Sequence, residues 1–267
     1  SYMVQSHDIK VDAAENVYVT GNFSGTCDFD PGPGVFNMTC GGFSGHCSFI
    51  TKYDSSGDFI WAKSYVADSS QPGSVQSWGI AIDGAGNVLT TGFFAGSVDF
   101  DSGIGSQLRQ SNGAGFEDAF IVRLSSAGNF LWVQRLGDLD DDRAHSIGLD
   151  FAGNAYILGS GYGGVGSQYS GGLDFWVCKF DPSGTLLWES SCGGPGFDTG
   201  FDIAVDSAGN SFATGRYEGE ADFDPSPSIQ NLQSAGSYDS YILKLDPNGN
   251  RVWAKSIGGS GSEEGRT

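Results

Sequence analysis

The chain is poor in positive charge, in methionine and in long apolar runs. Its 267 residues include 13 Lys and Arg against 32 Asp and Glu, a formal net charge of −19. This balance argues against a nucleic-acid backbone or an anionic membrane as the main partner, because both repel an acidic protein. No apolar run approaches the length of a transmembrane helix and no signal peptide is visible. We therefore expect a mature protein, or a piece excised from one, that does not span a membrane.

Cysteine is also scarce, with five residues and no C-x-x-C pair. Cys27, Cys40 and Cys47 fall in one short stretch, so their spacing is compatible with one local disulfide. Buried or idle thiols are an equal alternative. With Cys178 and Cys192 the count is odd, which leaves at least one thiol free or bonded to another chain. Cysteine usage therefore says little about the compartment.

Helical periodicity is absent, whereas glycine and short alternating segments are abundant. The chain has 43 Gly and 13% aromatic residues, which suits many short strands joined by tight turns. The segment DSAGNSFATG at 206–215 has three relatives: DAAENVYVTG from Asp12, DGAGNVLTTG from Asp83 and DFAGNAYILG from Asp150. Each follows an alternating apolar segment, so each predicts a β-hairpin with a D-x-x-G-N turn.

A second hairpin follows each first one, and a tryptophan falls at the same place after each second turn. These residues are Trp61, Trp132, Trp188 and Trp253. Long regular repeats predict a solenoid, propeller or array, and four strands per unit, A to D, are typical of a propeller blade. We predict an all-β propeller of four-stranded antiparallel blades. It would form one domain over 1–267, with blades near 1–65, 66–136, 137–192 and 193–267.

The repeat pattern IAVDxxGNxYxTG followed by DxFIxKLDxxGNxxWAKxxGG resembles the bacterial SBBP β-propeller repeats. It is more distantly similar to NHL-type propeller repeats. The resemblance covers essentially the whole chain and implies a general scaffold with no shared catalytic residues. Four units in phase are compatible with a closed four-bladed propeller. They also fit a section of a larger propeller, which the resemblance favours, and its open ends would then invite association.

The recurring turn and strand residues have structural explanations. The Asp of each turn can accept hydrogen bonds from backbone N–H groups, and the Gly supplies the positive φ of a type I turn with a bulge. Seven of eight turns keep this glycine, whereas Glu15 must adopt a strained left-handed geometry or change the turn. We expect the tryptophans to pack between blades, with a sugar-stacking platform as the alternative. A cation column on strand C predicts ion pairs or stems lying over the blade surface. This column is Lys52, Arg123, Lys179 and Lys244.

Strand order separates the connections into two faces. In an alternating blade the short A–B and C–D turns share one face, and the long B–C and D–A connections share the other. Binding residues tend to sit on such variable loops. Three B–C loops carry a D-F-D signature: Asp28-Phe29-Asp30, Asp99-Phe100-Asp101 and Asp222-Phe223-Asp224. These carboxylates are tentative calcium ligands; alternatively, the rings plug the blade edge and the carboxylates cap the turn.

Two further groups are candidates for binding. Asp138, Asp140 and Asp142 alternate in a D–A connection and are tentative calcium ligands, with a solvated charge run as the alternative. A column just before strand A reads His7, Trp78, His145 and Phe201. With Asp8 and Asp202 it could line the channel mouth as a small-ligand or catalytic centre. Otherwise its aromatic rings wedge between inner strands.

Together these patterns predict a non-enzymatic, extracellular or cell-surface protein of a secreted bacterial type. It would act as a structural, adhesive or protein-interaction module that binds protein or glycan at the B–C/D–A face. If a metal stabilises it, the hard oxygen ligands point to calcium, and otherwise no cofactor is expected. Tentative binding-face residues are Phe29, Phe100, Phe223, Trp78, His7 and His145. The alternatives are a lectin-like propeller and a glycan hydrolase or lyase with acidic residues at the channel mouth.

Overall fold

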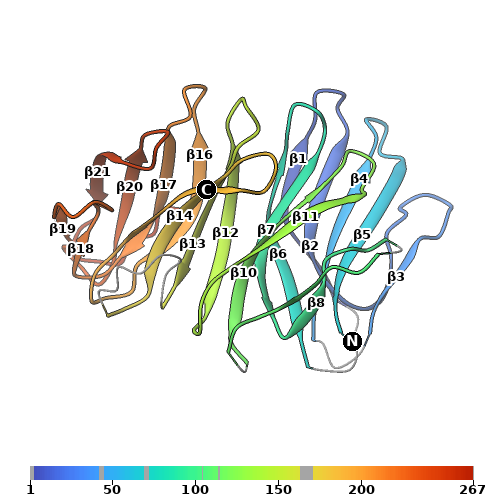
Figure 1. Ribbon diagram of the computed structural model, residues 1–267, viewed down its shortest axis with the longest axis horizontal. Coiled ribbons are helices and arrows are strands. Elements are labelled where there is room, and N and C mark those ends of the chain that lie inside the picture. Colours follow the sequence, from blue (N-terminus) through green and yellow to red (C-terminus); the bar gives the residue numbers. More distant parts are fainter. Residues whose placement is uncertain are drawn as a thin grey trace. The chain divides into compact units, whose positions relative to one another are not determined.

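The computed structural model describes residues 3–41, 45–68, 72–103, 105–113, 115–162 and 171–266. Within these ranges every regular element is a β-strand, which confirms the all-β prediction. The chain divides into two compact units, Ser1–Arg135 and Leu136–Thr267, each containing two antiparallel blades (Figure 1). The blades follow the four sequence repeats. Closure into one propeller domain stays a prediction, and each unit is described by itself.

Unit 1 contains blades 1 and 2. Strands A to D of blade 1 are β1 (Met3–Val11), β2 (Val17–Asp28), β4 (Cys47–Tyr53) and β5 (Phe59–Ala67). Those of blade 2 are β6 (Ser74–Ile82), β7 (Val88–Ala95), β10 (Glu117–Leu124) and β11 (Phe130–Leu136). The strands pair in this order in both blades, so strand A forms one edge of the blade and strand D the other.

Unit 2 contains blades 3 and 4. Strands A to D of blade 3 are β12 (Asp142–Leu149), β13 (Ala155–Gly161), β14 (Asp174–Phe180) and β15 (Leu186–Cys192). Those of blade 4 are β16 (Thr199–Val205), β17 (Ser211–Tyr217), β20 (Asp239–Leu245) and β21 (Arg251–Ile257). The pairing order is the same as in unit 1. Alternating strand direction therefore places the short turns on one face of each unit and the long connections on the other.

Short hairpins in three B–C connections extend the blades, and we call them straps. They comprise the end of β2 with β3 (Asn37–Cys40), β8 (Ser97–Asp99) with β9 (Leu108–Gln110), and β18 (Glu220–Asp222) with β19 (Asn231–Gln233). The blade 2 strap also pairs with β5 of blade 1, because Val66 and Ala67 face Asp99 and Val98. In unit 2, Gly193 pairs with Asp222 of the blade 4 strap. A strap thus ties the two blades of each unit together.

All eight short turns have the predicted positive φ at the same position. The residues are Glu15, Gly57, Gly86, Gly128, Gly153, Gly184, Gly209 and Gly249. Glu15 has a φ of 64°, so it adopts the left-handed geometry, the first of the two predicted outcomes. The side chain of Asp12 holds this turn by accepting from the Ala14 and Asn16 amides, both at 2.9 Å. The six other turns that begin with Asp make the same two contacts, so the strain at Glu15 is imposed by the motif.

Glu15→Gly should therefore stabilise the protein by about 0.5–1 kcal/mol, because glycine adopts a positive φ without a Cβ penalty. The gain is reduced by the larger backbone entropy that glycine loses on folding. Gly57→Ala is the matched control: a Cβ at Gly57 would meet nothing within 4 Å, so its expected loss reports on φ alone. Thermal unfolding followed by circular dichroism measures both effects. A lower melting temperature for Glu15→Gly would contradict the prediction.

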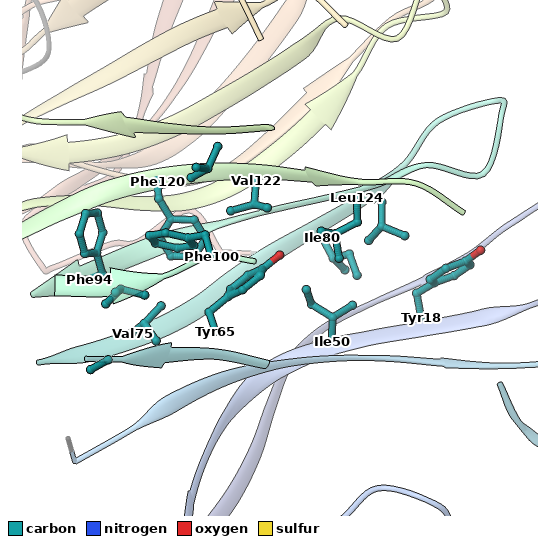
Figure 2. Packing of buried hydrophobic residues seen from close by; sticks show 14 residues of the cluster. Tyr18, Ile50, Tyr65, Val75, Ile80, Phe94, Phe100, Phe120, Val122 and Leu124 are labelled. Atoms are coloured by element: carbon teal, nitrogen blue, oxygen red, sulfur yellow. The ribbon is translucent and has the colours of Figure 1, made fainter. Parts of the chain in front are cut away.

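The core of each unit lies between its two blades. In unit 1 it joins Ile50 and Tyr65 of blade 1 to Ile80 and Phe120 of blade 2 (Figure 2). A cluster of the same kind joins blades 3 and 4 in unit 2. Strand A of the second blade contacts the preceding blade in both units. In blades 2 and 4, one face of strand A is therefore covered by the blade before it.

Candidate functional site

The first Asp of each D-F-D signature closes a strap loop. The Asp28 carboxylate accepts from the amides of Asp30 at 3.1 Å and Phe36 at 2.8 Å. Asp99 and Asp222 make the same pair of contacts, to the amides two and eight residues on. The second Asp accepts from the amide two residues further along, as Asp101 does from Gly103 at 2.8 Å. These carboxylates therefore cap their own loops.

The phenylalanines between these aspartates are core residues. Phe29, Phe100 and Phe223 are 6%, 0% and 0% exposed. Each ring packs edge-on or tilted against aromatic rings of strands B and C of its own blade. This burial contradicts the prediction that the three rings form part of a binding face, and it supports the alternative in which they plug the blade edge.

The carboxylates proposed as calcium ligands do not converge. Among the described residues there is no group of three or more His, Cys, Asp or Glu side chains that could hold a metal ion. Asp142 is fully buried and accepts from the Asp138 amide at 3.0 Å. Asp138 accepts from the Asp140 amide at 3.1 Å, and Asp140 itself is exposed. The carboxylates of Asp138 and Asp142 thus hold the backbone of this connection in a turn. Calcium binding stays a prediction.

A second fastening holds each strap to the start of strand C. In blade 2 the buried Asp118 accepts from the Asn112 amide at 2.8 Å, and in blade 4 Asp239 accepts from Ala235 at 3.2 Å. In blade 1 the equivalent of these aspartates is Cys47, which forms a disulfide with Cys40 at the end of β3. The disulfide therefore does in blade 1 what a carboxylate does elsewhere. Cys27, Cys178 and Cys192 form no disulfide within the chain, and whether any of them bonds to another chain stays a prediction.

The strand-pairing register makes the equivalence of the disulfide and the carboxylates testable. Cys40 corresponds to Ser111 and Ser234, whose hydroxyls accept from the Gly96 and Gly219 amides, both at 2.9 Å. The double variant Cys40→Ser, Cys47→Ser should lose about 2–3 kcal/mol of stability. The variant Cys40→Ser, Cys47→Asp, which imitates the other blades, should regain about 1–2 kcal/mol through charge-assisted hydrogen bonds.

Urea unfolding of the two variants and the wild type, with and without a reducing agent, measures these differences. The reductant should destabilise only the wild type. If the Ser/Asp variant were no more stable than the Ser/Ser variant, the proposed equivalence of carboxylate and disulfide would be wrong.

The straps of blades 1 and 2 border an open groove of about 440 Å³ in unit 1. Its lining residues are Thr39, Gly41, Val66, Ala67, Asp68, Asp99, Ser106 and Leu108. Leu108 is 51% exposed and projects from the outer strand of the strap, whereas Ala67 is buried. Apolar and carboxylate groups therefore share one concave surface on the face of the long connections. We call this surface the strap groove.

The His7, Trp78, His145, Phe201 column lies inside strand A. At each of these residues the pairing with strand B skips one position, so each is the extra residue of a β-bulge. This corrects the expectation that the column precedes strand A. A bulge re-aims one side chain while the strand continues. The residue after the bulge is used for blade contact: Asp8 accepts from the Ile80 amide at 3.0 Å.

The two histidines lie in different units and are engaged in different contacts. His7 contacts the Ser77 carbonyl at 3.1 Å and stacks edge-on against Trp78. The His145 Nε2 lies 2.9 Å from the Ser160 hydroxyl. Burial lowers the pKa of His7, and burial together with the nearby Arg143 charge lowers the pKa of His145 to about 4. Both rings are therefore neutral at physiological pH. A shared centre with Asp8 and Asp202 stays a prediction.

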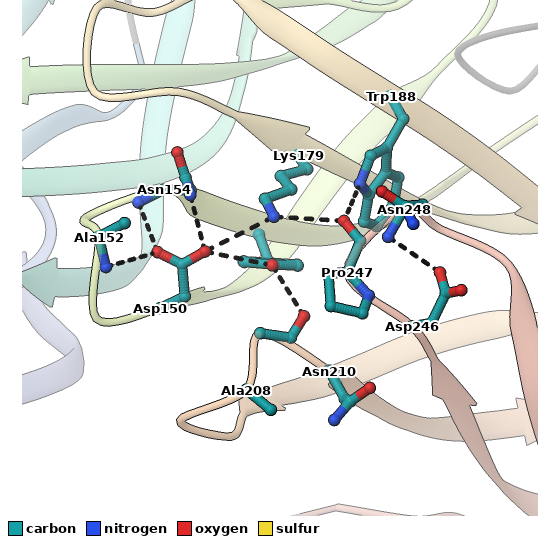
Figure 3. Close-up of polar contacts among 12 residues, drawn as sticks. Asp150, Ala152, Asn154, Lys179, Trp188, Ala208, Asn210, Asp246, Pro247 and Asn248 are labelled. Atoms are coloured by element: carbon teal, nitrogen blue, oxygen red, sulfur yellow. Dashed lines mark hydrogen bonds and ion pairs between the residues drawn. The ribbon is translucent and has the colours of Figure 1, made fainter.

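The face of the short turns is held by repeated polar contacts. In blade 3, Asp150 accepts from the Asn154 side chain at 2.8 Å and pairs with Lys179 at 3.5 Å (Figure 3). The equivalent cation of blade 2, Arg123, pairs with Asp83. Burial alone would raise the pKa of Asp150, but the Asn154 hydrogen bonds and the Lys179 charge lower it. These contacts confirm the predicted ion pairs for two of the four cations.

Two of the four tryptophans after the C–D turns, Trp61 and Trp188, pack between blades, as predicted. The Trp61 indole donates to the Ser126 carbonyl of blade 2 at 3.3 Å. Trp188 donates to the Pro247 carbonyl of blade 4 at 2.9 Å (Figure 3). These two rings are half-buried in blade contacts, so the sugar-platform alternative loses two of its four candidates.

Comparison with known proteins agrees with this architecture. A family model described as SBBP, beta-propeller repeat, matches residues 131–165. The chain is 24% identical to the uncharacterized WD repeat-containing protein L264 of Acanthamoeba polyphaga mimivirus, over 96% of this chain and 23% of that protein. It is 28% identical to the regulatory protein FlaEY of Caulobacter vibrioides, over 72% of this chain and 21% of that protein. The chain is built of propeller repeats. It spans less than a quarter of either relative, and a bacterial origin stays a prediction.

Proposed function

We propose that this chain is a non-catalytic propeller module that binds a protein partner at the strap groove. The observation that carries the proposal is a concave surface of mixed chemistry, built on hairpins that are themselves fastened to rigid blades. Rigid elements that present variable loops are the usual setting for recognition. The fold and the WD-repeat relative support an interaction module. Adhesive or structural roles would use the same surface.

The chemistry of the strap groove defines the partner. Leu108 and the backbone around Ala67 offer an apolar contact, and Asp68 and Asp99 place carboxylates beside it. In unit 1, large exposed apolar side chains also occur in the long connections: Val35, Phe36, Leu108 and Phe116. With a net charge of −19, the chain should attract a basic partner. We therefore propose a segment in which an apolar side chain neighbours a Lys or Arg.

An enzyme or lectin has less support. Asp198, a carboxyl group whose pKa is raised to about 7, is fully buried, so substrate cannot reach it. Within the described part of the chain, no helix has the length and apolar character that a membrane crossing requires.

We also propose an extracellular or surface location, which the Cys40–Cys47 disulfide supports because oxidising compartments preserve such bonds. We propose calcium only as a stabiliser. An increase in the melting temperature of the protein on addition of calcium would support this role, and an unchanged melting temperature would contradict it.

Selection from a displayed peptide library tests the proposed recognition. Peptides enriched on the wild-type chain should carry an apolar residue beside Lys or Arg. Leu108→Asp should weaken their binding by about tenfold or more, because it removes the apolar contact of the groove. Phe151→Ser is the matched control, since Phe151 is 99% exposed on a short turn of unit 2. Equal binding by both variants would contradict the proposed site.

A further inference from the structure

The strap groove has one side that is fastened by a disulfide and one side that is fastened by polar contacts. Thr39 and Gly41, which line the groove on the blade 1 side, flank Cys40 of the Cys40–Cys47 disulfide. The opposite side belongs to the strap of blade 2, which carries Leu108. The two sides should therefore respond differently to a reducing agent.

The strap of blade 2 is closed by hydrogen bonds and an ion pair. The Ser111 amide donates to the Gly96 carbonyl at 3.0 Å, and the Ser111 hydroxyl accepts from the Gly96 amide at 2.9 Å. Asp118 accepts from the Asn112 amide at 2.8 Å and pairs with Arg135 at 2.7 Å. Sheet pairing also joins this strap to β5, which lines the same groove. None of these contacts involves sulfur, so a reducing agent leaves them intact.

The strap of blade 4, in the other unit, is closed in the same way. The Ser234 amide donates to the Gly219 carbonyl at 2.9 Å, and the Ser234 hydroxyl accepts from the Gly219 amide at 2.9 Å. Asp239 accepts from the Ala235 amide at 3.2 Å and from the Ser256 hydroxyl at 3.1 Å. A serine and an aspartate are thus the pair that closes a strap in two of the three blades that have one.

Blade 1 has sulfur at both of these positions. Cys40 and Cys47 stand where the other two blades have the serine and the aspartate. Once the disulfide is broken, neither thiol can replace these groups, because a thiol is only a weak donor and acceptor of hydrogen bonds. The strap then keeps the pairing of β2 with β3, the burial of Met38 and the contact between the Thr26 and Thr39 hydroxyls at 2.9 Å. It loses its covalent link to the start of strand C.

The two sulfurs of this disulfide differ in their exposure. Cys40 is partly exposed, whereas Cys47 is fully buried. A thiolate of a dithiol reductant should therefore attack the Cys40 sulfur, and the S–S bond breaks with Cys47 leaving as a thiolate that takes up a proton. The second thiol of the reductant then displaces Cys40 from the mixed disulfide. Two electrons and two protons pass to the chain, and the reductant is oxidised to a disulfide.

We infer that the Cys40–Cys47 disulfide is a redox switch for the strap groove. The oxidised chain holds both sides of the groove in place, whereas a dithiol reductant releases the blade 1 side and weakens binding of the partner. A surface that must be ordered during binding loses affinity, because ordering costs free energy. The inference rests on the proposed recognition at the strap groove, since it concerns the regulation of the same surface. The straps of blades 2 and 4 have no such switch.

Hydrogen exchange and peptide binding, each measured with and without a dithiol reductant, test the inference. Reduction should accelerate exchange in 37–40 by about tenfold or more and leave exchange in 108–110 unchanged. The peptide most enriched in the displayed-library selection should bind the reduced wild-type chain about tenfold more weakly. Cys40→Ser, Cys47→Asp is the matched control, and its affinity should be the same with and without reductant. Cys27→Ser keeps the disulfide and should respond to the reductant as the wild type does.

The results separate the switch from the recognition on which it rests. Unchanged exchange in the blade 1 strap would overturn the switch, and so would equal acceleration in both straps, which indicates general unfolding. Peptide binding that depends on Leu108 but is equal in both redox states would overturn the switch and leave the proposed recognition standing. Binding that Leu108→Asp does not weaken would contradict the recognition itself, and the switch with it.

Discussion

Replacement of Phe100 by alanine is expected to destabilise unit 1 by about 3–5 kcal/mol, the cost typical of truncating a large buried aromatic ring. Phe100 is fully buried, and its ring centroid lies 5.3, 5.2 and 4.9 Å from those of Tyr65, Phe94 and Phe120 (Figure 2). These neighbours come from three strands, one of them in the preceding blade. Because hydrogen-bonded sheets hold those strands apart, the surroundings cannot collapse into the cavity.

Phe29→Ala provides the matched comparison within the same unit. Phe29 has two aromatic neighbours, Phe23 and Phe49, at 5.2 and 5.0 Å. Since an aromatic pair contributes about 0.5–1.5 kcal/mol beyond burial, the loss at Phe29 should be smaller by about 1 kcal/mol. Urea unfolding gives both losses, and hydrogen exchange locates them, with faster exchange expected in the strap of the altered blade. Equal losses would show that the neighbour from the preceding blade adds nothing.

The short turns and the four-stranded repeat could be predicted because their causes are local. A D-x-x-G-N turn needs only its own Asp and a residue that tolerates positive φ, and both lie within five positions of each other. The strain at Glu15 was foreseeable for the same reason. The role of the turn Asn was missed, although its side chain donates to the turn Asp, as Asn154 does to Asp150 at 2.8 Å. Asn at that position in four A–B turns was the available signal.

The straps could not be predicted because they depend on contacts far along the chain. A D-F-D signature suits a calcium loop or a capped turn equally well. The choice depends on whether the ring between the carboxylates is buried, and Phe100 is buried partly by Tyr65 of another blade. The role of the Cys40–Cys47 disulfide also depends on contacts far along the chain. Cys47 lies opposite Phe23, and Asp118 lies opposite Phe94 at the same place in the next blade, which shows that one blade uses sulfur where another uses a carboxylate.

The strand A column shows a different limit of sequence reading. His7 and His145 looked like members of a functional set because they recur at one position with variable neighbours. In the structure the position is a β-bulge, which has no residue preference that a single sequence reveals. The blades tolerate a different ring at each bulge because the neighbouring position makes the structural contact, as Ser146 does by donating to Asp202 at 2.6 Å.

Asp198→Asn is expected to make the protein more stable above neutral pH by about 2–4 kcal/mol. Asp198 is fully buried in the connection between blades 3 and 4. Burial, together with the negative charges of Asp174 and Glu218, raises its pKa to about 7. Hydrogen bonds from the Gly194 amide at 2.6 Å and the Glu218 amide at 3.0 Å oppose this rise without cancelling it.

The raised pKa determines the direction of the pH effect. Between about pH 4 and 7 the folded chain keeps a proton on Asp198 that the unfolded chain has released, so stability falls as the pH rises through this window. His145 acts in the opposite sense: its folded pKa of about 4 means that stability is lost as the pH falls below about 6.5. The two effects overlap, and the wild-type profile alone cannot separate them.

The difference between variant and wild type isolates Asp198, because His145 contributes equally to both. Asparagine keeps a carbonyl oxygen for the two backbone amides and cannot ionise. Unfolding free energies should therefore be similar for the two proteins near pH 4 and should diverge up to about pH 7, then stay a constant distance apart. Parallel profiles across this range would mean that Asp198 ionises in the folded chain as easily as in the unfolded one. That result would require water beside the Gly194 and Glu218 amides, where the structure has a closed contact between consecutive blades.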